Sequence, residues 1–279
     1  MRIGVHPNNL HLLLARHWPG AFAGLSPDFV AYPEGRSTGR LLAEGRIDVG
    51  GTGSTPPILA QVSGLDVIYL AASAPRPANG AILVRPDSPV RAVADLAGRT
   101  IALLDGSFHT YLLARVLATA GLTLPRVTRV ELSPAASREA LASGRVDAWV
   151  AMAPHLGEAL ASGAARELAP CGDTIPNRSV FWTIGARGLS AAQRDAFVAG
   201  LIGMGRAIAD DIDRAARILA GLGTGGVDAA AWRRSLAARD WTVVPADAAI
   251  VAEQEAEKQT LIRHGDIADR RAAAPAVAS

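Results

Sequence analysis

Short apolar runs alternate with amphipathic segments along most of the chain, and this alternation is typical of successive strand–helix units. In the first part, the strand-like runs are residues 3–5, 29–32 and 47–50, and the helix-like segments between them are 10–16 and 38–42. After Pro86 the strand-like runs are residues 100–103, 127–132 and 146–150, and the helix-like segments are 111–118 and 138–141. The pattern predicts βαβ units in mainly parallel sheets, so the predicted fold class is α/β.

The two series are also similar letter by letter. The segment LAEGRIDV at 42–49 is similar to LASGRVDA at 141–148, in which Gly45 aligns with Gly144, so the spacing is 144 − 45 = 99. The segment LLAR at 13–16 recurs at 112–115, and 112 − 13 is again 99. Two matches at one spacing predict a duplicated βαβαβ unit, each copy forming the core of one lobe. We expect Gly45 and Gly144 to end a helix in the left-handed conformation. Asp48 and Asp147 are expected to cap a turn at the base of the next strand.

The segments between and after the copies indicate how the lobes are connected. Residues 75–80 (PRPANG) precede an apolar strand and are interpreted as a crossing between lobes, and a second crossing is predicted near residues 180–184. Helical patterns dominate after Ser190 and would pack back onto the first lobe. The predicted division is lobe 1 from residues 1–79 plus 184–271, lobe 2 from 80–183, and a disordered tail at 272–279.

Composition excludes several classes of function. The chain carries 28 basic and 26 acidic residues and has no basic cluster interleaved with aromatics, so a nucleic-acid partner is not expected. No run of about 18 apolar residues occurs, so no membrane span is expected. Cys171 is the only cysteine and the six histidines lack metal-site spacing, so neither a metal nor a cofactor is expected. Met1 runs directly into a strand-like segment without a secretory signal, which keeps a cytoplasmic location open as the alternative to export.

The loop after the first strand of each copy is a candidate ligand contact, because ligands of open α/β sheets bind beyond the carboxyl ends of the strands. Residues 6–9 (HPNN) and 105–109 (DGSFH) both lead into a predicted helix. Asn8, Asn9 and Ser107 are good helix caps, and a helix start suits an anion. Plain helix capping without a ligand is the alternative.

A second pair of loops follows the third strand of each copy. Residues 50–57 (GGTGSTPP) are rich in glycine and hydroxyl groups, and 151–155 (AMAPH) is the counterpart. Glycine lets a backbone approach a ligand closely, and Thr52, Ser54 and Thr55 supply hydrogen-bond donors. A simple turn is the alternative. The run lacks the closing residues of a phosphate-binding loop.

Catalytic arrangements are poor. His6, His109 and His155 could face the cleft, but no carboxylate partner is evident for any of them. Phe108 and Trp149 are interpreted as core or rim residues, with a cleft wall as the alternative. No catalytic residue is assigned, and we do not expect an enzyme.

Several motifs, taken in their order along the chain, resemble those of a known family. GTGSTPPILAQ at 51–61 is similar to a segment of aliphatic-sulfonate-binding proteins, and VADLAG at 93–98 and GRVDAW at 144–149 fit the same family in the same order. The chain therefore resembles the aliphatic sulfonate, nitrate and taurine group of ABC-transporter substrate-binding proteins. The resemblance implies the type II periplasmic-binding-protein fold, in which two α/β lobes close over a small solute by hinge motion.

The resemblance also implies function and site. It implies capture of a small organosulfonate or related oxyanion, partnership with an ABC permease and its ATPase, and a periplasmic location; a monomer is expected. Carried onto matching positions, it gives these contact candidates: Asn8, Asn9, Thr52, Gly53, Ser54, Thr55, Ser107 and Phe108, followed by Trp149 and Met152. The family's Asp after Gly is absent from 51–55, and AMAPH at 151–155 replaces a more aromatic and acidic stretch. A larger or less polar ligand tail than that of taurine is therefore expected.

The main rival is a cytosolic enzyme on the same fold, resembling desulfinases or thiamine-pyrimidine synthases. A desulfinase needs a nucleophilic cysteine just after the first strand, where this chain has residues 6–9, and the synthase needs a cysteine-rich motif. A ligand-sensing module of a regulator is a third reading, but no DNA-binding or signalling segment accompanies it.

Overall fold

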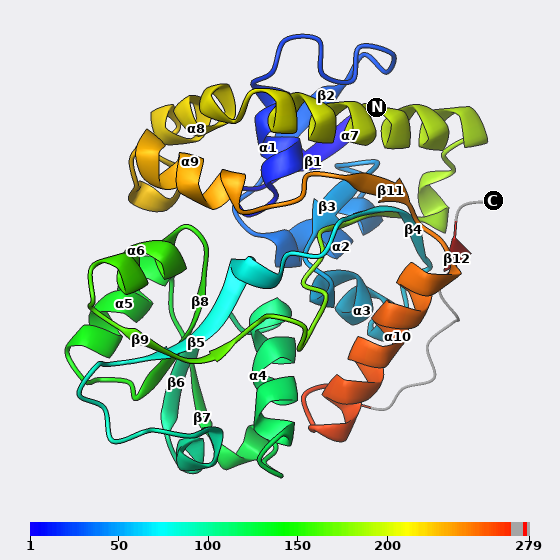
Figure 1. Ribbon diagram of the computed structural model, residues 1–279. Coiled ribbons are helices and arrows are strands. Elements are labelled where there is room, and N and C mark those ends of the chain that lie inside the picture. The colour runs from blue at the N-terminus through cyan, green and yellow to red at the C-terminus, as the bar shows by residue number, and fades with distance from the viewer. Residues whose placement is uncertain (269–275, 278–279) are drawn as a thin grey trace.

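The computed structural model describes residues 1–268 and 276–277, and its strands form two bodies that we call lobe 1 and lobe 2 (Figure 1). The strands of lobe 1 are β1 (Arg2–Val5), β2 (Asp28–Ala31), β3 (Gly50–Thr52), β4 (Val67–Ser73), β10 (Val180–Ile184), β11 (Val243–Pro245) and β12 (Ala276–Val277). The strands of lobe 2 are β5 (Gly80–Val84), β6 (Thr100–Leu103), β7 (Thr128–Glu131), β8 (Ala148–Met152) and β9 (Arg166–Pro170).

The duplication predicted from the sequence is confirmed by the strand order. In lobe 1, β1 lies parallel to β2 and is bridged through Ile3 to Val49, immediately before β3. In lobe 2, β6 lies between β7 and β8 and is parallel to both. The connecting helices are α1 (Leu10–Arg16) and α2 (Thr38–Ala43) in the first copy, and α4 (Phe108–Ala118) and α5 (Pro134–Ala142) in the second. Both copies therefore share one βαβαβ topology.

The repeated units form mainly parallel sheets, as predicted, but each lobe also contains antiparallel strands. β5 runs antiparallel to β8 and β9, and β10 runs antiparallel to β3 and β4. The register pairs Gly80, the first residue of β5, with Met152, the last residue of β8. A strand that carries the chain from the cleft into a lobe must run opposite to strands whose carboxyl ends face that cleft. The crossings between lobes thus impose the antiparallel pairs.

The second crossing lies earlier than predicted. β10 pairs with β3 and β4 in lobe 1, so the chain returns from lobe 2 between Pro170 and Val180 and not near residues 180–184. At the other end of the chain, the prediction of a disordered tail fails for Ala276–Val277, which pair with β4 where β11 leaves its edge open. The remaining tail residues, 272–275 and 278–279, lie outside the described residues.

The later helices pack mainly on lobe 1, as predicted, but the last one reaches both lobes. The remaining helices are α3 (Thr55–Val62), α6 (His155–Ala161), α7 (Ala191–Asp210), α8 (Ile212–Gly221), α9 (Ala229–Ala237) and α10 (Ala248–Arg263), and short 3₁₀ turns include η1 (Gly35–Ser37). Phe197 and Leu201 of α7 share a core with Leu12 of α1. α10 contacts α3 in lobe 1 and α4 in lobe 2, and its Leu261 is buried in the core of lobe 2 (Figure 1). Within the described residues, no helix combines the length and apolar character that a membrane crossing requires.

Candidate functional site

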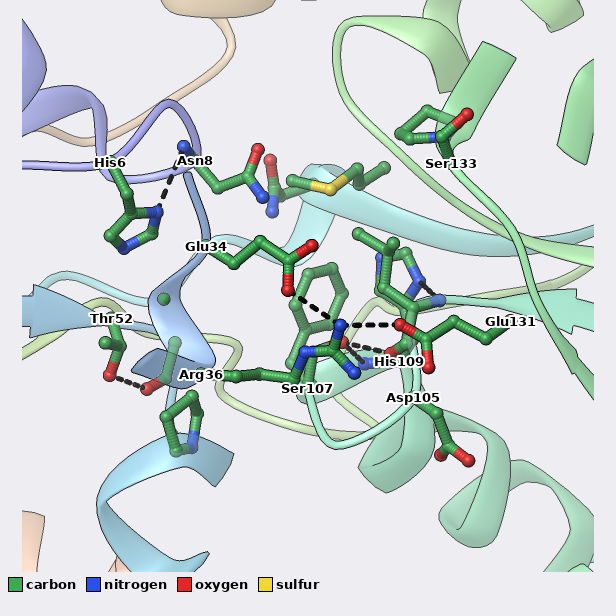
Figure 2. A pocket seen from close by; sticks show the side chains of 18 of the residues that line it. His6, Asn8, Glu34, Arg36, Thr52, Asp105, Ser107, His109, Glu131 and Ser133 are labelled. Atoms are coloured by element: carbon green, nitrogen blue, oxygen red, sulfur yellow. Dashed lines mark hydrogen bonds and ion pairs between the residues drawn. The ribbon is translucent and has the colours of Figure 1, made fainter. Parts of the chain in front are cut away.

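A cavity of about 650 Å³ lies between the lobes, beyond the carboxyl ends of β1, β3, β6, β7 and β8 (Figure 2). Lobe 1 contributes the β1–α1 loop, η1 and the β3–α3 loop, and lobe 2 contributes the β6–α4 and β7–α5 loops. Both crossings between the lobes also reach the cavity, through Arg76 and Asn79 on the first and Ser179 on the second. The cleft predicted from the repeat is therefore present.

Some of the contact candidates chosen from the sequence line this cavity. They are Asn8, Thr52, Gly53, Ser107, Phe108 and Met152. The hydroxyls among them already have partners within the protein. Thr52 Oγ1 accepts from Trp182 Nε1 at 3.1 Å and donates to Gly53 O at 2.7 Å. Ser107 Oγ donates to Leu104 O at 2.6 Å and accepts from the backbone N–H of His109, so Ser107 caps α4.

The other four candidates do not line the cavity. Asn9 is buried as the cap of α1, where its side chain accepts from Leu12 N. Ser54 and Thr55 face Glu257 of α10 instead of the cleft. Trp149 is only 1% exposed and packs in the core of lobe 2, because it lies within β8 while Met152 ends that strand at the cavity. The sequence places these residues in the right loops and strand, but side-chain direction removes them from the lining.

Glu257 is a buried carboxyl group that the sequence does not single out. Thr55 Oγ1 donates to its Oε1 at 2.5 Å, and Ser54 makes a second hydrogen bond to it. Burial raises the pKa of Glu257 to about 7, although the two hydroxyl groups act in the opposite direction. The start of α3 is thereby attached to α10.

Two histidines line the cavity in neutral form. His6 Nδ1 accepts from Asn8 N at 3.3 Å, which leaves the proton on Nε2 to donate to Gly51 O at 2.9 Å. His109 Nδ1 accepts from Leu104 N at 3.1 Å, and its Nε2 has no partner among the described residues. Burial lowers the pKa of His6 to about 4 and that of His109 to about 3. Both rings therefore act as fixed neutral groups, and His109 offers an unused donor.

The mouth of the cavity carries an ion-pair cluster that connects the lobes. Arg36 of η1 lies 2.7 Å from Glu34 in its own lobe and 2.6 Å from Glu131, the last residue of β7 in lobe 2 (Figure 2). The pKa of Arg36 is raised by its hydrogen bonds to these carboxylates, first Glu34 and then Glu131. The contact candidates predicted from the sequence lie in the loops after the first and third strands of each copy, not in those after the second. The loops after β2 and β7 meet the same criterion, and they supply this cluster.

The hinge end of the cavity carries buried positive charge. Arg76 donates to Asn177 O at 2.6 Å, to Asn177 Oδ1 at 3.0 Å and to Ser179 Oγ at 3.1 Å, which connects the two crossings. Burial lowers the pKa of Arg76 to about 10. Burial, and then the nearby charge of Arg76, lower the pKa of Arg239 to about 9. Both groups stay charged at neutral pH.

Nucleophilic and metal chemistry find little support in the described residues. Cys171 is fully buried, its thiol faces Ile175 O at 3.8 Å, and burial raises its pKa to about 11. The thiol is therefore protonated at neutral pH and is a poor nucleophile. Residues 1–268 and 276–277 contain no group of three or more His, Cys, Asp or Glu side chains placed to hold a metal ion.

Comparison with known proteins gives consistent matches. Residues 21–173 match the family model described as NMT1/THI5 like. A curated protein of Escherichia coli (strain K12), whose name describes it as aliphatic sulfonates-binding, is 35% identical over 200 residues. That match covers 72% of this chain but only 60% of the length of the relative.

Solved structures match over the whole chain. The alkanesulfonate-binding protein SsuA from Xanthomonas axonopodis pv. citri, bound to MOPS, is 31% identical with a TM-score of 0.87, covering 100% of this chain and 97% of that one. The periplasmic aliphatic sulphonate binding protein SsuA from Escherichia coli is 28% identical with a TM-score of 0.85, covering 100% and 93%. The desulfurization enzyme DSZB is 21% identical with a TM-score of 0.65, covering 99% and 96%, which shows a shared fold alone. The two-lobed α/β fold is thus that of the SsuA structures.

Proposed function

Since this chain belongs to the NMT1/THI5-like family, we propose that it is the solute-binding component of an ABC importer and captures a small organosulfonate between its lobes. The names of its relatives support this class of ligand, because an aliphatic sulfonates-binding protein and two SsuA proteins match the chain. The proposal extends to an ABC permease and its ATPase as partners, to the periplasm as location, and to a monomer as the working form.

The observation that carries the proposal is the composition of the cavity between the lobes. Its volume of about 650 Å³ lies within the range of small-molecule sites, roughly 300–1,000 Å³. Apolar side chains form part of its lining, namely those of Pro56, Leu104, Phe108, Leu132 and Met152. Buried arginine at the hinge end supplies positive charge. An apolar wall beside positive charge suits a ligand that has an organic tail and an anionic head.

The arrangement of the lobes supports capture by closure. Two chain crossings connect the lobes on one side, and Arg36 and Glu131 bridge them at the mouth. Hinge motion about the crossings would open the mouth by separating this pair. Our proposed ligand contacts are Asn8, Thr52, Gly53, Ser107, Phe108 and Met152. His109 is added because its Nε2 has no partner among residues 1–268 and 276–277.

An enzyme on the same fold is the weaker proposal. The one cysteine is buried and protonated, and His6 uses both ring nitrogens within the protein. Neither group is placed to attack a substrate in the cavity. We therefore propose binding without chemical change.

Calorimetric titration of the full chain with MOPS and unbranched alkanesulfonates tests this function. We expect saturable binding, and ligand at 100 times its Kd should add about 2.7 kcal/mol to the free energy of unfolding. Met152→Ala removes apolar contact with the tail and should weaken binding roughly fivefold, whereas the exposed Leu222→Ala should leave it unchanged. Absence of heat and of any melting shift with every sulfonate would contradict the proposed function.

A further inference from the structure

The side-chain acceptors of Asn79, Asn177 and Ser179 at the hinge end of the cavity are each occupied by an arginine. Arg76 uses both oxygens of Asn177 and the hydroxyl oxygen of Ser179. Asn79 Oδ1 accepts from Arg239 Nη2 at 2.5 Å. Any ligand group that enters this end therefore meets donors and no free acceptor from these residues.

Several of those donors have no partner. The bond from Arg239 fixes the amide of Asn79, so its Nδ2 faces another direction, and this buried nitrogen has no acceptor among the described residues. Asn79 is only 2% exposed. The Nε of Arg239 is likewise buried without a partner in the described part of the chain. Ser179 accepts from Arg76, which leaves its own hydroxyl hydrogen free to donate. Buried donors without acceptors are costly, so their grouping indicates an absent acceptor.

Positive charge at this end has no anionic partner among the described residues, and the guanidinium of Arg239 lies 5.7 Å from the centroid of the Trp241 ring. The described residues place no carboxylate in an ion pair with Arg76 or Arg239, and the charge of Arg76 acts unfavourably on Arg239. The mouth is different, because Arg36 there is shared by two glutamates. The cavity thus has a positive hinge end and a mouth where negative charge exceeds positive.

The donors lie around two adjoining spaces. Arg76 and Asn79 line both the main cavity and an adjoining hollow of about 70 Å³, which Arg239 also lines. Asn8 and Met152 are common to the two spaces as well. Arg239 does not line the main cavity itself, but the shared lining residues place it beside the hinge end of that cavity.

We infer that the anionic head group of the ligand binds at this hinge end, held by Arg76, Asn79 and Arg239 with the Ser179 hydroxyl as a further donor. A donor-only set with two fixed positive charges selects an oxyanion of a strong acid over neutral or cationic groups. The identification of that head group as a sulfonate rests on the proposed function. Its three oxygens could accept from Asn79 Nδ2, Arg239 Nε and Ser179 Oγ.

The site also gives the ligand a role in closure. Arg76 and Asn79 belong to the first crossing, Ser179 to the second, and Arg239 follows α9 of lobe 1. An anion bound to all of them would connect the two hinge segments to lobe 1. The organic tail would then extend toward Phe108 and Leu132 of lobe 2.

The test is calorimetric titration of MOPS into the full chain and its Arg239→Gln and Asn79→Ala variants, in Tris buffer of low ionic strength. Loss of a charge-assisted hydrogen bond should weaken binding at least about 30-fold in Arg239→Gln, with a smaller loss in Asn79→Ala. Arg233→Gln, an exposed arginine of α9 whose ion pair with Asp213 stays within lobe 1, is the matched control and should stay within about threefold of the wild type. Without ligand, Arg239→Gln removes one of two repelling charges but also the donor to Asn79 Oδ1, so its melting temperature is measured to check that the variant is folded.

Wild-type affinity for MOPS in Arg239→Gln, within about threefold, would overturn the inference. If no sulfonate binds the wild type, the proposed function fails alone, and sodium sulfate then tests the anion site directly. Sulfate that raises the melting temperature of the wild type more than that of Arg239→Gln supports the site. Equal shifts in both proteins overturn it.

Discussion

The base of each lobe is built in the same way in the two copies of the repeated unit. Gly45 follows α2 with φ +68° and Gly144 follows α5 with φ +73°, as expected for left-handed residues that end a helix. Asp48 accepts from Arg2 N at the start of β1 at 2.7 Å, and Asp147 accepts from Thr100 N at the start of β6 at 2.9 Å. These contacts join the third strand of each copy to the first, far from the cleft.

The cavity ends of the same copies differ. His6 has both ring nitrogens bonded within lobe 1, whereas Nε2 of His109 in lobe 2 has no partner in the described part of the chain. The third strand leads to Thr52 and Gly53 in one copy and to Met152 in the other. The comparison separates a scaffold end, where both copies need the same residues for local geometry, from a ligand end, where each copy supplies different groups.

The variant expected to show the largest effect of this difference is Glu257→Gln. Among the described residues, a buried carboxyl group holds the third-strand loop of the first copy and not that of the second. Burial raises the pKa of Glu257 in the folded state to about 7, from an ordinary value of about 4.5. Between these values the unfolded chain loses the proton while the native state keeps it, so the free energy of unfolding falls as pH rises. The total loss is on the order of 3 kcal/mol and is complete above about pH 7. Denaturant unfolding from pH 4.5 to 8 should show that Glu257→Gln lacks this decline.

Other titrating groups are common to both proteins and cancel in that difference. Burial lowers the pKa values of His6, His11 and His109, so their contributions are lost on acidification and have the opposite slope. Glu255→Gln on the same helix is the control and should keep the wild-type profile, because the Glu255 side chain is 41% exposed and forms an ion pair with Lys258. Parallel profiles for wild type and Glu257→Gln would show that Glu257 is ionised throughout.

Much of the fold could be predicted because the repeat is a local signal. Gly45 and Gly144 reveal helix ends by residue type alone, and the 99-residue spacing aligns the two copies. Strand direction could not be predicted in the same way. β5 and β10 look like any buried strand, and their antiparallel pairing depends on where the chain crosses between lobes.

The candidate site was predictable at the level of loops but not of side chains. Ser54 and Thr55 have the residue types of a ligand loop, yet a distant glutamate on α10 accepts from both. Arg76 and Arg239 carry no local motif, and only the folded chain brings them together, 163 positions apart (239 − 76), at one cavity end. A residue that acts through long-range packing produces no periodic pattern in the sequence from which it could be predicted.

The variants Gly45→Ala and Gly144→Ala test whether the ends of the two lobes that lie far from the cleft are equivalent. An L-residue in the left-handed region costs roughly 1–2 kcal/mol, and the added Cβ meets only the flexible ends of Arg187 and Arg85, respectively. We expect the two variants to lose stability by amounts that agree within about 0.5 kcal/mol. Gly203→Ala, inside α7 with open space around the added Cβ, should instead gain up to about 1 kcal/mol. If the losses of unfolding free energy in Gly45→Ala and Gly144→Ala, measured in urea, differ by more than about 1 kcal/mol, the two lobe ends are not equivalent.

The smallest expected effect concerns the contact between the two ligand ends, Arg36 with Glu131. Their side chains are 41% and 44% exposed, so solvent screens the pair, and Glu34 remains as a partner when Glu131 is removed. A double-mutant cycle of Arg36→Gln and Glu131→Gln, read out as MOPS affinity, should give a coupling of about 0.5 kcal/mol, roughly a twofold change in Kd, that shrinks further in 0.5 M salt. Glu34→Gln is the control, because its bond to Arg36 stays within lobe 1 and should not couple to closure. A coupling above about 2 kcal/mol would mean that the mouth, and not the hinge end with its buried charge, holds the lobes together around the ligand.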